Sequence, residues 1–219
     1  MKEVHQDLED YRKRFDRMYE LGYDSCWYDD EIPSEIADYV QFLISNNLLD
    51  IKTSEILDLG CGRGQLLRYL EQGGFRQIIG VDISEVATQF SSSHTVESHI
   101  IVADAIKGLP FKTNTFSLVT ELTVLSSLNP QHWPTILNEI YRVLERGGSY
   151  ISEVFSREQK SDQNRPLVTK SPIPWELDQV YGVTAEELVN IFGRTFSINQ
   201  YRPFNPRLSD SFYVLAQKI

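Results

Sequence analysis

Apolar residues at the start of the chain recur at intervals of three and four, which is the spacing of one face of an α-helix. The first such stripe is formed by Val4, Leu8, Tyr11, Phe15 and Met18. Gly22 follows this stripe and is expected to end the helix. A second helix is expected to begin near Pro33, because proline suits the first helical turn, and to end at Asn46 and Asn47. The pattern therefore predicts two amphipathic helices at the start of the chain.

The pattern changes at residue 54, where short apolar runs alternate with amphipathic segments. Expected strands occupy residues 55–59, 77–82, 100–104, 116–122 and 149–155. Helical spacing separates most of these runs, and the clearest case is the segment from Pro130 to Leu144. Strands that alternate with helices form a mostly parallel sheet with helices on both faces. The sequence therefore predicts an α/β fold with a doubly wound sheet.

The last part of the chain departs from this alternation. Residues 156–175 are polar and contain prolines, which is typical of a loop or a mobile cover. A capping box from Thr184 to Glu187 predicts one more helix. Two alternating runs, residues 195–201 and 211–217, end the chain. We expect them to pair as an antiparallel hairpin at the edge of the sheet.

A glycine-rich loop, Asp58-Leu59-Gly60-Cys61-Gly62-Arg63-Gly64, joins the first expected strand to the helix after it. Glycines at alternate positions let the backbone turn sharply and approach a ligand closely. The free N–H groups of the following helix point at the same place. Structural tight turns also use such glycines, so the loop alone indicates a ligand site only weakly.

Two aspartates strengthen this interpretation because they follow the next two strands. Asp82 ends the second expected strand, where a carboxylate can accept both hydroxyls of an adenosine ribose. Asp104 ends the third, where its side chain or the Ala105 amide can meet the adenine edge. Open α/β sheets bind ligands in the crevice at the carboxyl ends of their strands. The alternatives are that Asp82 caps the next helix and that Asp104 merely ends a strand.

An ordered set of segments now resembles a known family, the class I S-adenosylmethionine-dependent methyltransferases. The segments are residues 56–64, 80–84, 103–104, 109–111, 116–119 and 144–148. The resemblance runs from about Glu55 to Phe155, and the terminal hairpin is similar to the last two strands of that family. It implies a Rossmann-like doubly wound sheet with strand order 3-2-1-4-5-7-6 and strand 7 antiparallel. It also implies S-adenosylmethionine as the cofactor and an N-terminal helical lid.

On this resemblance, we expect one methyltransferase domain over residues 1–219. Its parts are N-terminal helices and lid over 1–50, a cofactor-binding core over 54–155, and a cover loop, helix and terminal hairpin over 156–219.

The resemblance further implies which residues hold the cofactor. The residues expected at the methionine part and its ammonium are Asp58, Gly60, Cys61, Gly62 and Gly64. Asp82 would bind the ribose, Ile83 would pack on the adenine, and Asp104 and Ala105 would meet the adenine edge. Glu121 and Leu122 would border the methionine part and the acceptor. Many relatives have Asp in place of Ser117 and His in place of Ser126 or Ser127, so the acceptor-side chemistry departs from the family pattern.

Candidate acceptor residues come from three parts of the sequence. Aromatic residues gather before the sheet: Tyr11, Tyr19, Tyr23, Trp27 and Tyr28. Their ring faces favour sulfonium and ammonium groups, although ordinary packing explains Tyr11 and Tyr19 equally well. Glu121 is the candidate for orienting an amine or taking its proton, and a strand-end surface charge is its alternative.

His132 is a second candidate base, with a solvated or capping role as its alternative. Glu153 and Trp175 are weaker candidates for binding the acceptor, and Arg202 could equally face solvent. Methyl transfer requires no nucleophilic side chain, because the cofactor's methyl group is already activated and alignment supplies much of the rate.

Composition limits the possible partners. The formal net charge is −10, which argues against nucleic acid and fits a neutral or cationic acceptor, although solubility alone also explains it. Two cysteines and no Cys/His cluster with ligand spacing give no reason to expect a metal. No apolar signal segment or membrane span is evident, so we expect a cytoplasmic protein with no membrane partner.

The preferred function is methyl transfer to N or O of a small molecule, possibly an amine. A protein-lysine N-methyltransferase is the alternative: a small closed pocket favours the first and an open groove the second. A nicotinamide-dependent oxidoreductase is a remote alternative, because the loop contains G-x-G-x-G instead of G-x-G-x-x-G. A non-catalytic adenosyl-binding protein would bind the cofactor without turnover.

Overall fold

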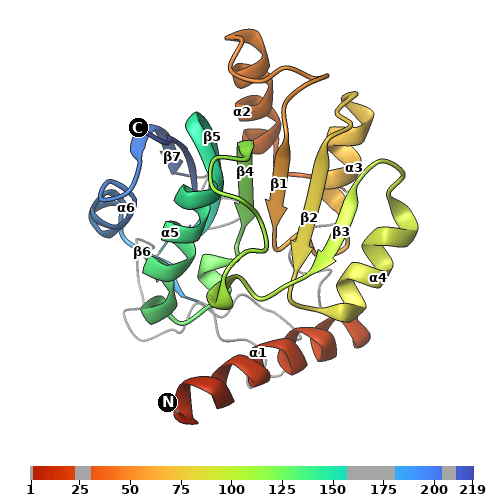
Figure 1. Ribbon diagram of the computed structural model, residues 1–219. Helices are drawn as coiled ribbons and strands as arrows, with labels where there is room; N and C mark the ends of the chain where they lie inside the picture. The colour runs from red at the N-terminus through yellow and green to blue at the C-terminus, as the bar shows by residue number, and fades with distance from the viewer. Residues whose placement is uncertain (1, 23–30, 157–180, 204–210) are drawn as a thin grey trace.

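The computed structural model describes residues 2–22, 31–156, 181–203 and 211–219, and it is built around one sheet (Figure 1). The strands are β1 (Ile56–Leu59), β2 (Ile78–Asp82), β3 (His99–Val102), β4 (Phe116–Leu122), β5 (Leu144–Ser156), β6 (Gly182–Val183), β7 (Ser197–Pro203) and β8 (Ser211–Gln217). Their order is β3-β2-β1-β4-β5-β8-β7, and the short β6 pairs with β5.

This order confirms the predicted topology. β1 to β5 are parallel, whereas β8 is antiparallel to both β5 and β7. The chain contains the unpredicted strand β6, so β7 and β8 correspond to the family's sixth and seventh strands. The predicted hairpin is present, with β8 inside the sheet and β7 at its edge. The third strand ends at Val102, two residues earlier than predicted.

Helices cover both faces of the sheet. They are α1 (Lys2–Glu20), α2 (Ser34–Ser45), α3 (Gln65–Gln72), α4 (Glu85–His94), α5 (Trp133–Val143) and α6 (Ala185–Phe192). Short 3₁₀ turns are η2 (Ala105–Lys107), η3 (Leu125–Ser127) and η4 (Pro130–His132). The Ser84 hydroxyl caps α4 by accepting from the Ala87 N–H at 3.1 Å. The predicted capping box of Thr184 and Glu187 begins α6.

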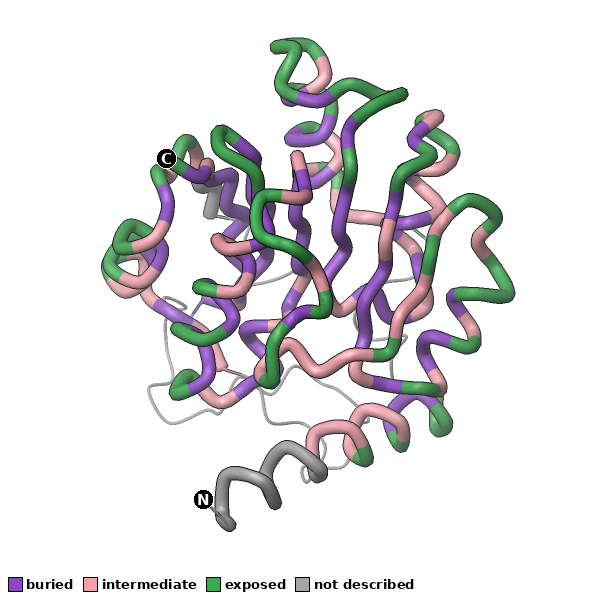
Figure 2. The backbone as a smooth tube through the Cα atoms, viewed as in Figure 1, coloured by how far each residue is buried: buried purple, intermediate pink, exposed green. Residues whose placement is uncertain are grey.

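The core forms two layers, one on each face of the sheet, and the central strands between them are largely buried (Figure 2). Ile56 of β1 packs with α2 and α3, whereas its neighbour Leu57 packs on the side of α5 and α6. Successive strand residues point to opposite faces, so both must be apolar when both faces are covered. This is why the central strands appear in the sequence as unbroken apolar runs.

The carboxyl ends of β1, β2 and β3 point toward α1, which crosses that edge of the sheet (Figure 1). The second N-terminal helix has a different role: Ile36, Tyr39, Val40 and Leu43 are buried against the sheet, so α2 is part of the core. Of the helices and lid expected over residues 1–50, only α1 is therefore left as the candidate lid among the described residues. Most of the predicted cover, residues 157–180, lies outside the described residues.

Among the helices described, none is both long enough and apolar enough to cross a membrane.

Candidate functional site

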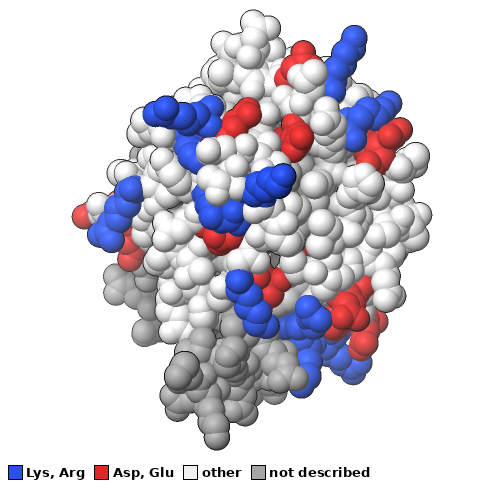
Figure 3. Space-filling model, in the orientation of Figure 1, with Lys and Arg blue, Asp and Glu red and all other residues white. Residues whose placement is uncertain are grey.

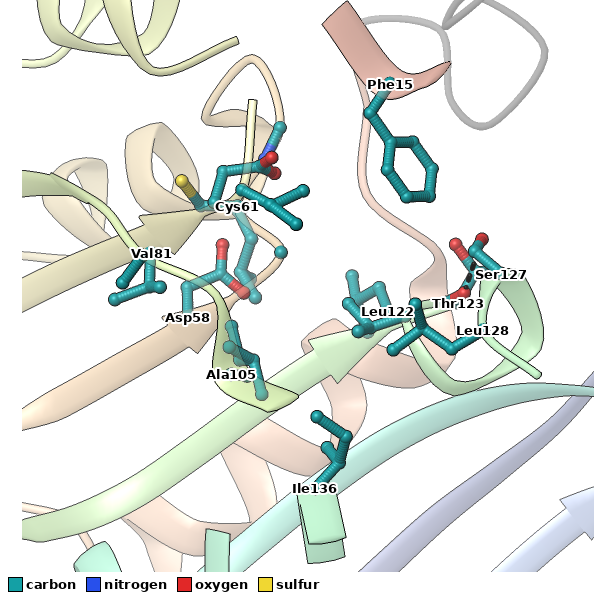
Figure 4. A pocket seen from close by; sticks show the side chains of 18 of the residues that line it. Phe15, Asp58, Cys61, Val81, Ala105, Leu122, Thr123, Ser127, Leu128 and Ile136 are labelled. Atoms are coloured by element: carbon teal, nitrogen blue, oxygen red, sulfur yellow. Dashed lines mark hydrogen bonds between the residues drawn. The ribbon is translucent and has the colours of Figure 1, made fainter. Parts of the chain in front are cut away.

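A pocket lies at the carboxyl ends of β1 to β4, beneath α1. Its lining from the sheet side includes the glycine loop, the ends of β2 and β3, and the segment after β4. Phe15 of α1 points into the space between the Asp58–Cys61 group and the segment carrying Leu122, Thr123 and Leu128 (Figure 4). We name two sides of this pocket after the roles proposed for them below. The cofactor side is formed by the lining residues of the glycine loop and by residues 81–83 and 103–106, and the acceptor side by Leu122, Thr123, Val124, Ser127 and Leu128. Gly64, which was predicted to hold the cofactor, does not line the pocket.

The glycine loop fits tightly between its neighbours. Gly60 has a φ of +74°, and a Cβ on it would lie 2.1 Å from Cγ2 of Val124. Gly62 has a φ of +51°, and a Cβ there would lie 2.8 Å from the Tyr19 hydroxyl oxygen. Both positions need glycine for conformation and for space. The loop therefore contacts α1 on one side and the segment after β4 on the other.

The carboxylate of Asp82, at the end of β2, is fixed by two backbone N–H groups. One carboxylate oxygen accepts from the Gly62 N–H at 2.9 Å, and the other accepts from the Ser84 N–H at 2.8 Å. The side chain is buried, and this burial raises the pKa of Asp82 to about 6 against the lowering effect of those N–H donors. The Ser84 hydroxyl, not Asp82, is the side-chain cap of α4, so capping does not explain this carboxylate.

Asp58 is buried beside it at the end of β1. Its carboxylate accepts from the Thr120 hydroxyl at 2.8 Å. Burial raises the pKa of Asp58 to about 7, the Thr120 hydrogen bond lowers it, and the negative charge of Asp82 raises it further. In the described part of the chain, neither Asp58 nor Asp82 forms a salt bridge with a Lys or Arg. A cationic ligand would therefore meet two buried, unneutralised carboxyl groups here.

Asp104 and Ala105 line the pocket beyond β3, as the sequence predicted for an adenine edge. Asp104 begins η2 by accepting from the Ile106 N–H at 3.0 Å. Its second carboxylate oxygen lies 3.3 Å from the Lys107 ammonium. Asp104 is thus a turn-forming residue that also borders the pocket.

Glu121 does not line the pocket, although Leu122 beside it does. Its side chain is fully buried on the α5 and α6 side, where it accepts hydrogen bonds from Tyr150 and Ser152 of β5. Burial raises the pKa of Glu121 to about 8, and the hydrogen bonds from Ser152, the turn and Tyr150 oppose this. This placement corrects the prediction that Glu121 faces the acceptor, because strand alternation turns it into the core.

The other predicted candidates are dispersed. His132 is buried and lies edge-on to Tyr11, outside the pocket lining. Glu153 is buried on β5 and accepts from the Tyr213 hydroxyl at 3.2 Å, and burial raises its pKa to about 7.

Among the predicted aromatic residues, Tyr19 lines the pocket. The Tyr11 hydroxyl accepts from the Asn129 N–H at 3.1 Å, also outside the lining. Trp27, Tyr28 and Trp175 lie outside the described residues, as does the side chain of Arg202.

Phe15, Arg63, Thr123 and Ser127 are among the lining residues that were not predicted as site residues. Phe15 belongs to the apolar stripe of α1, and that stripe gives no signal to separate a pocket residue from a packing residue. Arg63 lies within the glycine motif, and its guanidinium lies 4.5 Å from the centroid of the Phe90 ring. Thr123 and Ser127 follow β4, where the sequence led us to predict Glu121 and Leu122 instead.

Comparison with known proteins agrees with the geometry. Residues 56–148 match the family model described as a methyltransferase domain. The human mitochondrial arginine-hydroxylase NDUFAF5 is 36% identical over 130 residues, which are 58% of this chain and 34% of that protein. The tRNA N(3)-methylcytidine methyltransferase trm140 of Schizosaccharomyces pombe is 25% identical over 165 residues, 69% of this chain and 54% of that protein. The chain thus spans about a third to a half of the length of these relatives.

A solved structure extends the likeness to nearly the whole fold. The 1,6-didemethyltoxoflavin-N1-methyltransferase of Burkholderia thailandensis, with bound 1,6-didemethyltoxoflavin and S-adenosylhomocysteine, has a TM-score of 0.72 at 17% identity. The match covers 98% of this chain and 89% of that one. The match to the family model, the strand order and the glycine loop with its acidic companions point to one family. Residues 56–148 of this chain thus resemble a methyltransferase domain, on a fold with the strand order of the class I S-adenosylmethionine-dependent family.

Proposed function

We propose that this domain transfers the methyl group of S-adenosylmethionine to a nitrogen or oxygen of a small-molecule acceptor. The observation that carries the proposal is the position of α1 across the pocket. Arg12 pairs with Glu85 at 3.0 Å at the start of α4, and Tyr11 accepts from Asn129 at 3.1 Å beyond η3. A helix attached on both sides of a pocket, with Phe15 inside it, suits an enclosed small acceptor better than an open groove.

The cofactor side fits the donor. The buried carboxyl groups of Asp58 and Asp82 suit its ammonium and sulfonium charges, and Asp82 would also accept from the ribose hydroxyls. Gly60 and Gly62 line the pocket with backbone alone, in close contact with Val124 and Tyr19, and Asp104 with Ala105 would meet the adenine. S-adenosylmethionine supplies the activated methyl group, and the chain supplies alignment and exclusion of water.

The acceptor side supports an uncharged acceptor. Its described lining consists of Leu122, Thr123, Val124, Ser127 and Leu128, with Phe15 opposite, and contains no ionisable side chain. An amine would therefore react as its free base, and a heteroaromatic nitrogen needs no proton removed beforehand. The apolar side chains hold such an acceptor against the donor while the two hydroxyls supply hydrogen bonds.

The relatives act on varied substrates, so acceptor class is part of the proposal. The bound ligand of the Burkholderia enzyme is a small molecule, whereas trm140 acts on tRNA. On the face seen in Figure 3, Lys and Arg side chains are interspersed with Asp and Glu, and the net charge is −10. This pattern does not favour a phosphate backbone as partner. A protein side chain such as lysine is the competing acceptor.

The test has two stages. Thermal unfolding should show a raised Tm with excess S-adenosylmethionine and no change with NAD. Release of S-adenosylhomocysteine should then be measured against separate sets of amines, heteroaromatic bases, phenols, lysine peptides and RNA. We expect turnover with one of the small-molecule sets. Turnover with peptides or RNA alone would show that the acceptor is not a small molecule. A Tm that rises with NAD would contradict the assignment of S-adenosylmethionine as the cofactor.

A further inference from the structure

The segment that follows β4 holds an unusual backbone conformation. Thr123 has a φ of +65°, in the left-handed region that β-branched residues rarely adopt. The other non-glycine residues with positive φ in the described part of the chain are Asn47 and Asn114, and asparagine tolerates this region. Such strain persists only where surrounding contacts enforce it.

The contacts that enforce it come from both sides of Thr123. Its N–H donates to the carbonyl of Glu153 on β5 at 2.9 Å. Its own carbonyl accepts from the N–H of Ser127 at 3.0 Å and from the Ser127 hydroxyl at 2.9 Å. The turn also directs Val124 onto Gly60, whose missing side chain provides the space. The strained residue thus joins the acceptor side to the glycine loop.

Glu121 supports this turn from inside the core. One carboxylate oxygen accepts from the Leu125 N–H at 3.3 Å, and the other accepts from the Tyr150 hydroxyl at 3.0 Å and from Ser152. The carboxylate therefore connects η3 to β5 beneath the pocket. No pocket-lining role explains why a fully buried glutamate stands at this position, whereas its contacts with the turn do.

The Thr123 hydroxyl is the group that this turn makes available. Thr123 lines the acceptor side of the pocket, and its hydroxyl makes no hydrogen bond with the described residues. We propose that Glu121 is a positioning residue, which holds the turn so that the Thr123 hydroxyl hydrogen-bonds the methyl acceptor. This inference rests on the proposed function. It requires that the acceptor carry a polar atom that can form a hydrogen bond with the Thr123 hydroxyl.

The first test needs no acceptor. In Glu121→Gln, the amide exchange of Leu125 and Ser127, followed by hydrogen-deuterium exchange, should be at least tenfold faster than in the unsubstituted protein. A crystal structure of the variant should show Thr123 with a negative φ. Ser152→Ala, which removes one donor to the same carboxylate, should give a smaller increase and serves if Glu121→Gln does not fold. Unchanged exchange in both variants would overturn the positioning role.

The second test uses the acceptor with the fastest turnover in the screen. Thr123→Val keeps the side-chain shape and removes the hydroxyl, so the acceptor KM should rise at least tenfold while the affinity for S-adenosylmethionine changes less than threefold. Thr123→Ser should recover most of the acceptor affinity. Glu121→Gln should add little to Thr123→Val, because the hydroxyl that it positions is already absent. Additive effects, or an unchanged KM in Thr123→Val, would contradict the proposal.

Tyr39→Phe is the matched control, because it removes a buried hydroxyl that donates to the Tyr213 carbonyl at 3.2 Å on the α2 face of the sheet, opposite to Glu121. It should lower stability and leave the acceptor KM unchanged. If the unsubstituted protein does not bind S-adenosylmethionine, the proposed function is refuted. The hydrogen exchange of Glu121→Gln would still test the positioning role of Glu121 independently.

Discussion

The two sides of the pocket are built differently. The cofactor side consists of backbone turns and carboxylates at strand ends, where Asp58 and Asp82 face the pocket with little neutralising charge. The acceptor side presents apolar groups and hydroxyls, and its carboxylate, Glu121, points away into the core. One side thus presents charge to its ligand, whereas the other uses charge to fix a turn. Substitutions that affect one side should leave the other largely intact, except where they touch.

The contact between the sides should give the largest effect. Gly60→Ala places a Cβ at 2.1 Å from Val124, and Gly147→Ala, at nearly the same φ of +76°, meets nothing within 4 Å. Gly147→Ala should cost about 1 kcal/mol from backbone strain alone. Gly60→Ala should cost about 3 kcal/mol or more, because overpacking adds to that strain. Urea unfolding measures both free energies.

The additional substitution Val124→Ala should restore stability to Gly60→Ala, since it removes the atom that clashes. Equal costs for the two glycine variants, or no rescue, would mean that the sides are not joined at this contact.

Removal of the carboxylate proposed to bind the ribose should rank second. Asp82→Ala removes the proposed acceptor of two hydroxyls and leaves the Gly62 and Ser84 N–H groups unpaired. Hydrogen bonds to a charged group contribute about 1.5–3 kcal/mol each, so S-adenosylmethionine affinity should fall roughly 100-fold or more. Titration calorimetry gives the value. Glu55→Ala, at an exposed acid before β1, should change affinity less than twofold.

A distinct pH dependence should follow from the buried carboxyl groups. Their folded pKa values, about 7 for Asp58, 6 for Asp82 and 8 for Glu121, lie above the ordinary values near 4. The folded state therefore binds more protons than the unfolded state, and the stability of the free protein should fall as pH rises from about 4 to 8. Urea unfolding should therefore give a lower free energy of unfolding at pH 8 than at pH 5.

The two sides should respond differently to the donor. A bound cation favours ionised Asp58 and Asp82, so S-adenosylmethionine should bind more tightly as pH rises from 5 to 7. The contribution of Glu121 to the pH dependence of stability should persist in the protein with bound donor, because its side chain faces the core. Asp58→Asn should flatten the binding profile, and Glu121→Gln should flatten only the stability profile. The comparison would be contradicted if Glu121→Gln flattened the binding profile and Asp58→Asn did not.

The smallest effect should come from the edge of α1. Arg12 and Glu85 form an exposed ion pair at 3.0 Å, with side-chain exposures of 41% and 58%. Such pairs contribute about 0.2–1 kcal/mol, less at high salt. Arg12→Ala should therefore lower stability by about 0.5 kcal/mol and change S-adenosylmethionine affinity less than threefold. A much larger loss of affinity would show that the cover of the pocket depends on this pair.

The sequence by itself determined the alternation of strands and helices, and, with the family resemblance, the order of the strands. It also located the cofactor side, because a strand, a glycine turn and a helix N-terminus lie within ten consecutive residues, 56–65. Asp82 and Asp104 were predicted at strand ends for the same reason: parallel strands bring their carboxyl ends to one edge of the sheet. These signals are local, or they repeat with a fixed period.

Only the tertiary structure decided which way Glu121 points. Both faces of β4 are covered, so its apolar run has no alternation to mark one face, and Leu122 rather than Glu121 reaches the pocket. The left-handed Thr123 is likewise invisible in sequence, because it depends on the carbonyl of Glu153 on a separate strand. Phe15 gave the same helical signal as its buried neighbours in α1. Periodicity records that a side chain is covered, and the packing of distant elements decides what covers it.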